Sequence, residues 1–338
     1  MRAAYITAKE DLQIRTVDTP DAGADQVRIR IDYVGICGSD LHYYYEGANG
    51  AFVVREPLIP GHEVSGRIDH DPRGEWPTGT PVTIHPARFG TPAEKLDDYP
   101  HLWAGGSYLG SASTWPHTQG GMAEMIIVER SMVRVLPETL PVRRAVLAEP
   151  LAVVLHALHR AIEVSGDIAG QRVLVSGSGP IGLLMVAAVH AYGAASVAAT
   201  DVLAEPLERA RAVGADTVYN VMTDDIAPNS YDVVFECSGV APAISTAFIA
   251  ARPAGTVIQV GMVPDEPRPI NLAPAIAKEL TVRGTFRFRD EIDEAVQLLA
   301  DNPAIEQVIT HEFSLDDTVA AFAAAKDSAA SGKVVVAL

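Results

Sequence analysis

The stretch Arg172–Gly182, which reads RVLVSGSGPIG, decides the fold of this 338-residue chain. Its first half is typical of a buried strand, and its second half has glycines at the spacing GxGxxG. In a dinucleotide-binding turn, Gly177 permits the tight bend, Gly179 leaves room for a pyrophosphate, and Gly182 lets a helix pack closely on the strand. A plain glycine-rich turn needs neither the strand nor the apolar helix, so the stretch predicts a dinucleotide site at a helix N-terminus. The first residues of that helix are Pro180 and Ile181.

An acidic residue, Asp201, ends the next predicted strand about 20 residues after the glycines. A carboxylate there can accept hydrogen bonds from both hydroxyls of the adenosine ribose and would repel a 2′-phosphate. Asp201 therefore favours NAD over NADP, the alternative being an exposed aspartate without a ligand. Later strand ends are expected on the nicotinamide side of the sheet, at Ser238, Val260, Gly261 and Met262.

Strand-like and helix-like blocks alternate around this stretch, which predicts βαβ units and a parallel sheet covered on both faces. The residues before it alternate apolar and polar in short segments separated by turn residues, so that part is mainly β. After about Gly284 the strand-and-turn pattern returns, with one helix at 291–300 and a last strand at 333–338. We infer that this tail rejoins the first part. The predicted domains are residues 1–148 with 286–338, and residues 149–285.

Composition excludes several classes of partner. The chain has 26 basic and 43 acidic residues, a net charge of −17, and no clustered basic run for nucleic acid. Two cysteines cannot form the disulfide framework of a small secreted domain, and the first 17 residues lack the apolar core of a signal peptide. The apolar run 181–200 is better explained as a buried helix followed by a strand than as a membrane span. We therefore expect a cytoplasmic protein with neither nucleic acid nor membrane as a partner.

Four residues of the first half suggest a metal site. Catalytic zinc takes three protein ligands and leaves one position open. We expect Cys37, in the loop 35–42, and His62 as two of them, and a carboxylate, Glu63 or Glu149, as the third; the sequence leaves that choice open. Singly, each has an ordinary explanation, such as a packed cysteine, a turn histidine or a first-turn glutamate that faces a helix dipole. Together they predict one zinc ion.

Ser39 and His42 supply a path for a proton. An alcohol on zinc loses its proton more easily, and Ser39 can accept that proton and pass it through the cofactor ribose to His42. The ordinary pKa of an imidazole lies near neutrality, which suits this role. The pattern therefore predicts hydride transfer from an alcohol to a nicotinamide. A non-catalytic NAD-binding scaffold and a zinc-free reductase are the alternatives, and neither needs this set of side chains.

Several strings resemble one family over nearly the whole chain. They are GICGSDLHY at 35–43, GHE at 61–63, AEPL at 148–151, the glycine turn, and GTFRF at 284–288. The chain resembles the zinc-dependent medium-chain dehydrogenases of the polyol and sugar-acid group. The resemblance implies an α/β protein in which a GroES-like, mainly-β catalytic domain is split around a doubly wound Rossmann domain. It also implies a homo-oligomer, a dimer or a tetramer.

The resemblance carries further residues and a substrate class. It implies substrate contacts at Tyr43, Glu149 and Arg287. A sugar acid such as L-idonate, oxidised at C5 to 5-ketogluconate, is the expected substrate, with Arg287 as a carboxylate clamp. A neutral polyol such as sorbitol, xylitol or galactitol is the alternative. The implied cofactor contacts are Ile181, Asp201, Val260, Gly261, Met262, Thr285, Phe286 and Arg287.

The chain departs from this family at two places. Many relatives carry four cysteines for a structural zinc in the lobe that spans 86–108 here, and this chain has none there. We expect no structural zinc and a lobe held by packing of Tyr99, Trp103 and Tyr108. Pro206 stands where relatives often place a basic residue near the adenosine ribose, which weakens an NADP interpretation further.

Overall fold

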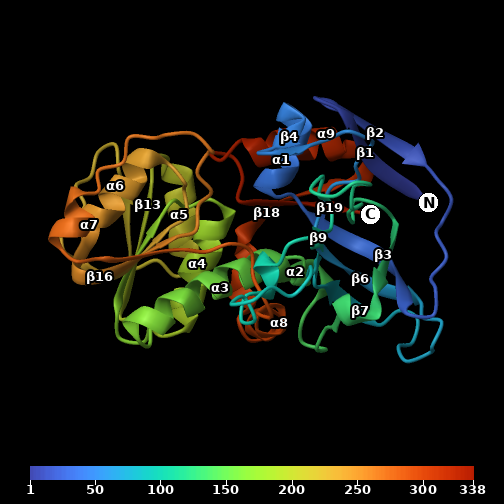
Figure 1. The fold of residues 1–338 in the computed structure, drawn as a ribbon, viewed down its shortest axis with the longest axis horizontal. Coiled ribbons are helices and arrows are strands. Elements are labelled where there is room, and N and C mark those ends of the chain that lie inside the picture. The colour runs from blue at the N-terminus through green and yellow to red at the C-terminus, as the bar shows by residue number, and fades with distance from the viewer.

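The computed structural model describes residues 1–338 and contains two large sheets, seen on the left and right of Figure 1. The right-hand sheet has seven strands in the order β11-β7-β6-β3-β19-β18, with β10 paired to β3. Its strands are β3 (Gln26–Gly35), β6 (Glu63–His70), β7 (Pro81–Ile84), β10 (Met125–Glu129), β11 (Val133–Val135), β18 (Ile309–Ser314) and β19 (Lys333–Ala337). Strand β19 lies antiparallel to β3, with Val335 opposite Gly35. The end of the chain thus returns to the sheet formed by its beginning.

The left-hand sheet is parallel and has the order β14-β13-β12-β15-β16-β17, the doubly wound arrangement of a dinucleotide fold. Its strands are β12 (Arg172–Ser176), β13 (Ser196–Asp201), β14 (Thr217–Asn220), β15 (Tyr231–Glu236), β16 (Ala251–Gln259) and β17 (Thr281–Gly284). The accompanying helices are α4 (Pro180–Ala191), α5 (Ala204–Ala212), α6 (Ala241–Ala250) and α7 (Ala273–Ala277). The predicted parallel sheet is confirmed, and the apolar run 181–200 divides into α4 and β13 as expected.

Helix α3 (Ala148–Ser165) lies between the two sheets and packs against α4, α8 (Ile292–Asp301) and β6. Leu151, Leu155 and Leu158 recur at helical spacing and are fully buried. They belong to a core cluster that also contains residues of the parallel sheet and Val335 of β19. Truncating one such leucine to alanine costs about 2–5 kcal/mol, so α3 fixes the two sheets relative to each other.

Smaller elements complete the fold. Short strand pairs are β1 (Arg2–Ala8) with β2 (Asp11–Thr16), β4 (Ala48–Asn49) with β5 (Phe52–Val53), and β8 (Ala87–Arg88) with β9 (Ser107–Tyr108). Short helical turns are α2 (Val142–Ala145), η1 (Pro100–Leu102), η2 (Arg130–Met132), η3 (Pro303–Val308) and η4 (Leu315–Asp317). No helix combines the length and the hydrophobicity needed to cross a bilayer.

Two predictions about local structure were wrong. The expected loop 35–42 becomes helix α1 (Gly38–Glu46) after Cys37, because the Asp40 carboxylate accepts the Cys37 N–H at 2.9 Å and Gly47 ends the helix at φ 74°. A second helix, α9 (Thr318–Lys326), follows α8 where we expected only strands and turns. Alanine stabilises this helix by propensity, and its weak segregation of apolar from polar residues hid it.

Candidate active site

Three potential metal ligands converge at one end of the seven-stranded sheet. Cys37 follows β3, and His62 and Glu63 lie at the start of β6. Strands β3 and β6 are antiparallel, with Gly35 opposite Glu63, so the sequence-distant thiol and imidazole come to the same edge. One ligand atom from each of the three side chains lies within 4.8 Å of the others. His62 and Glu63 are buried.

The charges around these residues fit a cation. Glu63 Oε1 accepts a hydrogen bond from Lys333 Nζ at 2.7 Å, but Glu63 Oε2 is buried without a partner. Asp40, Glu63 and Glu149 are three buried carboxylates, and the buried ammonium of Lys333 pairs with Glu63 alone. Buried negative charge without compensation is costly. A sulfur, a nitrogen and a carboxylate oxygen are ligands that zinc prefers, so this site fits the zinc ion predicted from the sequence.

Glu149 lies in the first turn of α3, close to but outside the three-residue group. Its Oε1 accepts a hydrogen bond of 2.5 Å from the Tyr108 hydroxyl. Burial raises the pKa of the Glu149 carboxyl, and the neighbouring Glu63 raises it further, although His62 opposes the change. Burial alone would lower the pKa of His62, but Cys37, Glu149 and Asp40 together raise it well above its usual value. Burial is the main cause of the raised pKa at Glu149, whereas at His62 the neighbouring acidic groups outweigh burial.

Arg287 reaches the same place from the segment after β17. Its guanidinium carbon lies 4.1 Å from the centre of the Tyr108 ring and 4.9 Å from that of Phe286. The Tyr108 ring also meets the His62 ring edge-on, with 5.5 Å between the ring centres. Two of the three expected substrate contacts, Glu149 and Arg287, are therefore connected through Tyr108, which the sequence suggested only as a packing residue of the lobe.

Helix α1 carries the other predicted catalytic residues. Ser39 and His42 are three positions apart and therefore share one face of the helix. His42 is half-exposed, and its Nδ1 lies 3.0 Å from Glu46 Oε1. Tyr43, the third expected substrate contact, is buried, and its hydroxyl lies 3.2 Å from Ser111 Oγ and accepts the Ala112 N–H. Tyr43 thus already has partners within the protein.

The glycine turn has the geometry that the sequence predicts. Gly177 adopts φ 92°, and a Cβ on Gly182 would lie 1.8 Å from the Gly177 carbonyl oxygen, whereas the space around Gly179 is open. Helix α4 begins at Pro180, followed by Ile181. Asp201 ends β13 and accepts the Ser178 N–H of this turn at 2.9 Å. This aspartate therefore fixes the glycine turn against the end of β13.

Glu236 orders the nicotinamide side of the sheet, a role that the sequence analysis missed. This fully buried residue accepts hydrogen bonds from the Ser238 and Gly239 N–H groups and from Gln259 Nε2. A glutamate directly after the apolar run 233–235, followed by Cys-Ser-Gly, was the available signal. The remaining predicted contacts follow β16 and β17 at the same end of the sheet, and Thr285 Oγ1 is buried without a partner. They are Val260, Gly261, Met262, Thr285 and Phe286.

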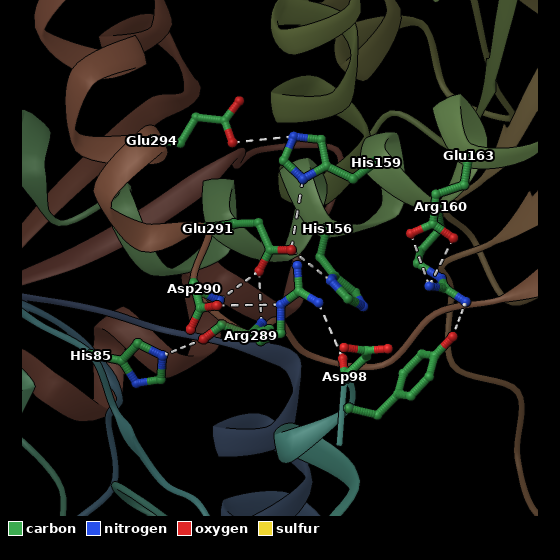
Figure 2. A network of polar contacts seen from close by, with 11 residues as sticks. His85, Asp98, His156, His159, Arg160, Glu163, Arg289, Asp290, Glu291 and Glu294 are labelled. Atoms are coloured by element: carbon green, nitrogen blue, oxygen red, sulfur yellow. Dashed lines mark hydrogen bonds and ion pairs between the residues drawn. The ribbon is translucent and has the colours of Figure 1, made fainter. Parts of the chain in front are cut away.

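The lobe at 86–108 is tied to α3 by polar contacts as well as by packing. Arg160 of α3 lies 5.1 Å from the centre of the Tyr99 ring and donates to its hydroxyl at 3.3 Å (Figure 2). Trp103 Nε1 donates to the Leu96 carbonyl oxygen within the lobe. Tyr108, the third residue predicted to pack here, points into the active site instead.

A second buried histidine–carboxylate group adjoins the lobe, and we call it the Glu291 network (Figure 2). Glu291 Oε1 lies 2.8 Å from His156 Nδ1 and 3.7 Å from His159 Nδ1. Its Oε2 accepts the N–H groups of Arg289 and Asp290 at 2.7 and 3.0 Å. Burial would raise the pKa of the Glu291 carboxyl, but the bonds from His156 and His159 lower it far below its usual range. Every oxygen of this carboxylate is thus satisfied by the protein.

Comparison with known proteins assigns the family. The description "Alcohol dehydrogenase GroES-like domain" matches residues 23–138, and "Zinc-binding dehydrogenase" matches residues 180–301. The chain is 35% identical to the L-idonate 5-dehydrogenase (NAD(P)(+)) of Escherichia coli (strain K12), over 98% of this chain and 97% of that protein. The chain belongs to the zinc-binding medium-chain dehydrogenases. The predicted family, the GroES-like and Rossmann fold class and the assignment as an oxidoreductase are confirmed.

Other relatives agree at the level of the family. The sorbitol dehydrogenase of Gallus gallus is 33% identical, over 96% of this chain and 93% of its own length. The crystal structure of the Escherichia coli L-idonate 5-dehydrogenase superposes with a TM-score of 0.92 at 32% identity, covering 100% of this chain and 98% of that one. That of the 2R,3R-butanediol dehydrogenase from Bacillus subtilis gives 0.87 at 27% identity, covering 100% and 99%. Family membership implies a catalytic zinc and NAD or NADP.

Proposed function

We propose that this enzyme oxidises a secondary alcohol of a sugar acid, L-idonate to 5-ketogluconate, with NAD as the hydride acceptor. The observation that carries the substrate class is Arg287. Its guanidinium is held against two aromatic rings, next to the metal-ligand group, and no carboxylate of the protein pairs with it. A guanidinium in this position has its donors free for a planar carboxylate. The relative named L-idonate 5-dehydrogenase supports the same assignment.

Separate residues would bind the metal and transfer the proton. Cys37, His62 and Glu63 would hold the zinc, which, when bound, lowers the pKa of an alcohol oxygen and makes hydride transfer to NAD feasible. Ser39 is placed on α1 to accept the alcohol proton, and half-exposed His42, one turn further, passes it to water. Lys333 keeps one oxygen of Glu63 occupied, which leaves the other for the metal.

A matched pair of measurements tests the substrate. Initial rates of NAD reduction are compared for L-idonate, sorbitol, xylitol and galactitol, in the wild type and in Arg287→Gln. The variant should raise the KM for L-idonate about tenfold or more, the effect of losing a charge-assisted hydrogen bond, and should leave the neutral polyols nearly unchanged. A higher kcat/KM for a neutral polyol than for L-idonate contradicts the proposal.

A neutral polyol remains the second candidate. The net charge of −17 repels an anionic substrate, and the sorbitol dehydrogenases match nearly the whole chain.

A non-catalytic NAD-binding scaffold is the lowest alternative. Elemental analysis separates it from both enzymes, because a scaffold has no need of metal. We propose one catalytic zinc per chain and no structural zinc; two zinc ions per chain would contradict this, and none would favour the scaffold.

The choice of NAD is proposed on Asp201. Asp201→Ala should weaken the binding of NAD about tenfold and should reduce the difference in affinity between NAD and NADP. The substitution removes both the acceptor for the ribose hydroxyls and the carboxylate that repels a 2′-phosphate. Asp201→Asn is the control, since it can still accept the Ser178 N–H that the carboxylate accepts in the wild type. The dissociation constants of NAD and NADP are measured for each variant. An unchanged ratio of the two constants in Asp201→Ala would show that Asp201 does not select NAD.

The organisation of the chain is proposed in the same way. We propose a catalytic domain of residues 1–148 with 286–338 and a nucleotide domain of residues 149–285, supported by the pairing of β19 with β3. We propose a homo-oligomer, a dimer or a tetramer, supported by the edge strand β17 with its exposed Val282 and by exposed Ile276 of α7. Light scattering of the purified protein measures the mass of the oligomer in solution.

We also propose a cytoplasmic location, which the two unpaired cysteines support.

A further inference from the structure

Tyr108 enters the active site from an element that holds none of the expected ligands. It is the last residue of β9, in the lobe, and its side chain is buried between α3 and the segment after β17. Its hydroxyl donates to Glu149 Oε1 at 2.5 Å. Its ring lies under the Arg287 guanidinium at 4.1 Å. One side chain therefore contacts both the acidic and the basic group of the site.

The two candidate carboxylate ligands differ in what occupies their oxygens. Each has one oxygen bonded to a protein donor: Lys333 Nζ donates to Glu63 Oε1, and the Tyr108 hydroxyl donates to Glu149 Oε1. The other oxygen of Glu63, Oε2, is buried without a partner. A donor that bonds one carboxylate oxygen fixes the orientation of the whole carboxylate, and so fixes where its second oxygen lies. Accordingly, Glu63 lies in the group of ligand atoms within 4.8 Å, and Glu149 lies outside it. The two carboxylates are similarly buried but have different donors, and the hydrogen bond from Tyr108 holds Glu149 in a position outside the ligand group.

The ring has a separate effect on Arg287. This residue adopts φ 50°, a left-handed conformation that costs a non-glycine residue about 1–2 kcal/mol, so neighbouring contacts must hold it there. Arg287 makes no ion pair with the protein, and its contacts are the faces of Tyr108 and Phe286. Phe286 is partly exposed, while Tyr108 is buried. The Tyr108 ring is therefore the fixed surface on which the guanidinium rests.

We propose that Tyr108 is a positioning residue with two actions: its hydroxyl keeps Glu149 out of direct metal coordination, and its ring holds Arg287 for the substrate carboxylate. The first action depends only on the metal site. The second rests on the proposed function, because it concerns an anionic substrate. The two actions are separable by substitution, since phenylalanine removes only the hydroxyl and leucine removes the ring as well.

The first action is tested on the Co²⁺-substituted enzyme, whose visible absorption reports the number and kind of ligands. Tyr108→Phe should change this spectrum, because the released Glu149 carboxylate can then reach the metal, and should lower kcat about tenfold with little change in KM. The double variant Tyr108→Phe with Glu149→Gln should restore the wild-type spectrum. Glu149→Gln alone should also keep it, because Glu149 is not a ligand. An altered spectrum in Glu149→Gln, or an unaltered one in Tyr108→Phe, overturns this action.

The second action is tested by KM for L-idonate. Tyr108→Phe should keep KM within about twofold, whereas Tyr108→Leu should raise it on the order of tenfold, as Arg287→Gln does. Equal KM values in Tyr108→Phe and Tyr108→Leu overturn the role of the ring. Failure of the sugar-acid proposal is recognised separately, because Arg287→Gln itself would then leave KM unchanged while the Co²⁺ spectra still decide the role of the hydroxyl.

Discussion

The metal-ligand group and the Glu291 network both combine histidine with glutamate, but only the first has a cysteine, and their carboxylates differ in whether both oxygens have partners. Both bury histidine beside glutamate. At Glu63, one oxygen accepts from Lys333 and the other has no partner. At Glu291, one oxygen contacts His156 and the other accepts two backbone N–H groups. Residue types alone therefore do not indicate a cation site; a buried carboxylate oxygen without a hydrogen-bond partner does.

The largest expected effect comes from the thiolate. Cys37→Ser should lose zinc and lower kcat/KM by several kcal/mol, on the order of 10³-fold, while NAD binding persists. Cys237→Ser is the matched control, because Cys237 packs against the core of the parallel sheet and should keep its zinc. Zinc content and turnover are measured together. Full activity in Cys37→Ser would show that the thiolate is not a ligand.

Removal of the metal should destabilise the metal-ligand group and leave the Glu291 network unchanged. A chelator should lower the Tm of the wild type, because a ligand bound at 1,000 times its Kd stabilises the folded state by about 4 kcal/mol. Cys37→Ser should show no further decrease on addition of chelator. A variant in the Glu291 network should show the same decrease as the wild type, and a smaller one would mean that this network also holds metal.

The Glu291 network should prove purely structural. Glu291→Gln removes the charge that His156 and His159 share, which should cost about 2–4 kcal/mol of unfolding free energy and lower Tm by roughly 4–8 °C. Zinc content per chain should remain at the wild-type value. Loss of zinc in this variant would show that the Glu291 network contributes to metal binding, and would contradict its purely structural role.

The smallest expected effect depends on pH. The nearby carboxylates of Glu291, at 3.7 Å, and of Glu294, at 3.1 Å, raise the pKa of His159 above its ordinary 6.5, although burial opposes them. Protonated His159 therefore stabilises the fold, fully below pH 6.5, and the contribution disappears as pH rises through the raised pKa. His159→Gln should cost about 0.5–1 kcal/mol at pH 6 and nothing at pH 9. A thermal-shift series over this range is the measurement, and a difference that grows with pH would contradict the assignment.

Local motifs were predictable because local sterics enforce them. The spacing of Gly177 and Gly182 placed the turn and the start of α4 correctly, since the close approach of these two residues is a property of one short segment. Convergence of Cys37, His62 and a carboxylate followed from the zinc chemistry of those residue types. The choice between Glu63 and Glu149 did not, because it depends on Tyr108, which reaches Glu149 only through the folding of the lobe.

Other features left no signal in the sequence. Cysteine is not among the preferred N-cap residues, so the start of α1 after Cys37 was missed. The role of Lys333 was missed because its partner, Glu63, is 270 positions away. A lysine at the start of a predicted strand is usually solvent-exposed, and only the position of β19 between β3 and β18 brings Lys333 inside.

The position of Lys333 on the last strand has a consequence for biosynthesis. Glu63 leaves the ribosome, together with Cys37 and His62, long before the ammonium group that pairs with it, because 270 residues separate Glu63 from Lys333. At 5–20 residues per second that interval is roughly 15–50 s, during which the nascent chain exposes an acidic, thiol-bearing edge of an incomplete sheet. The pairing of Lys333 with Glu63 is therefore a late event, coupled to the pairing of β19 with β3.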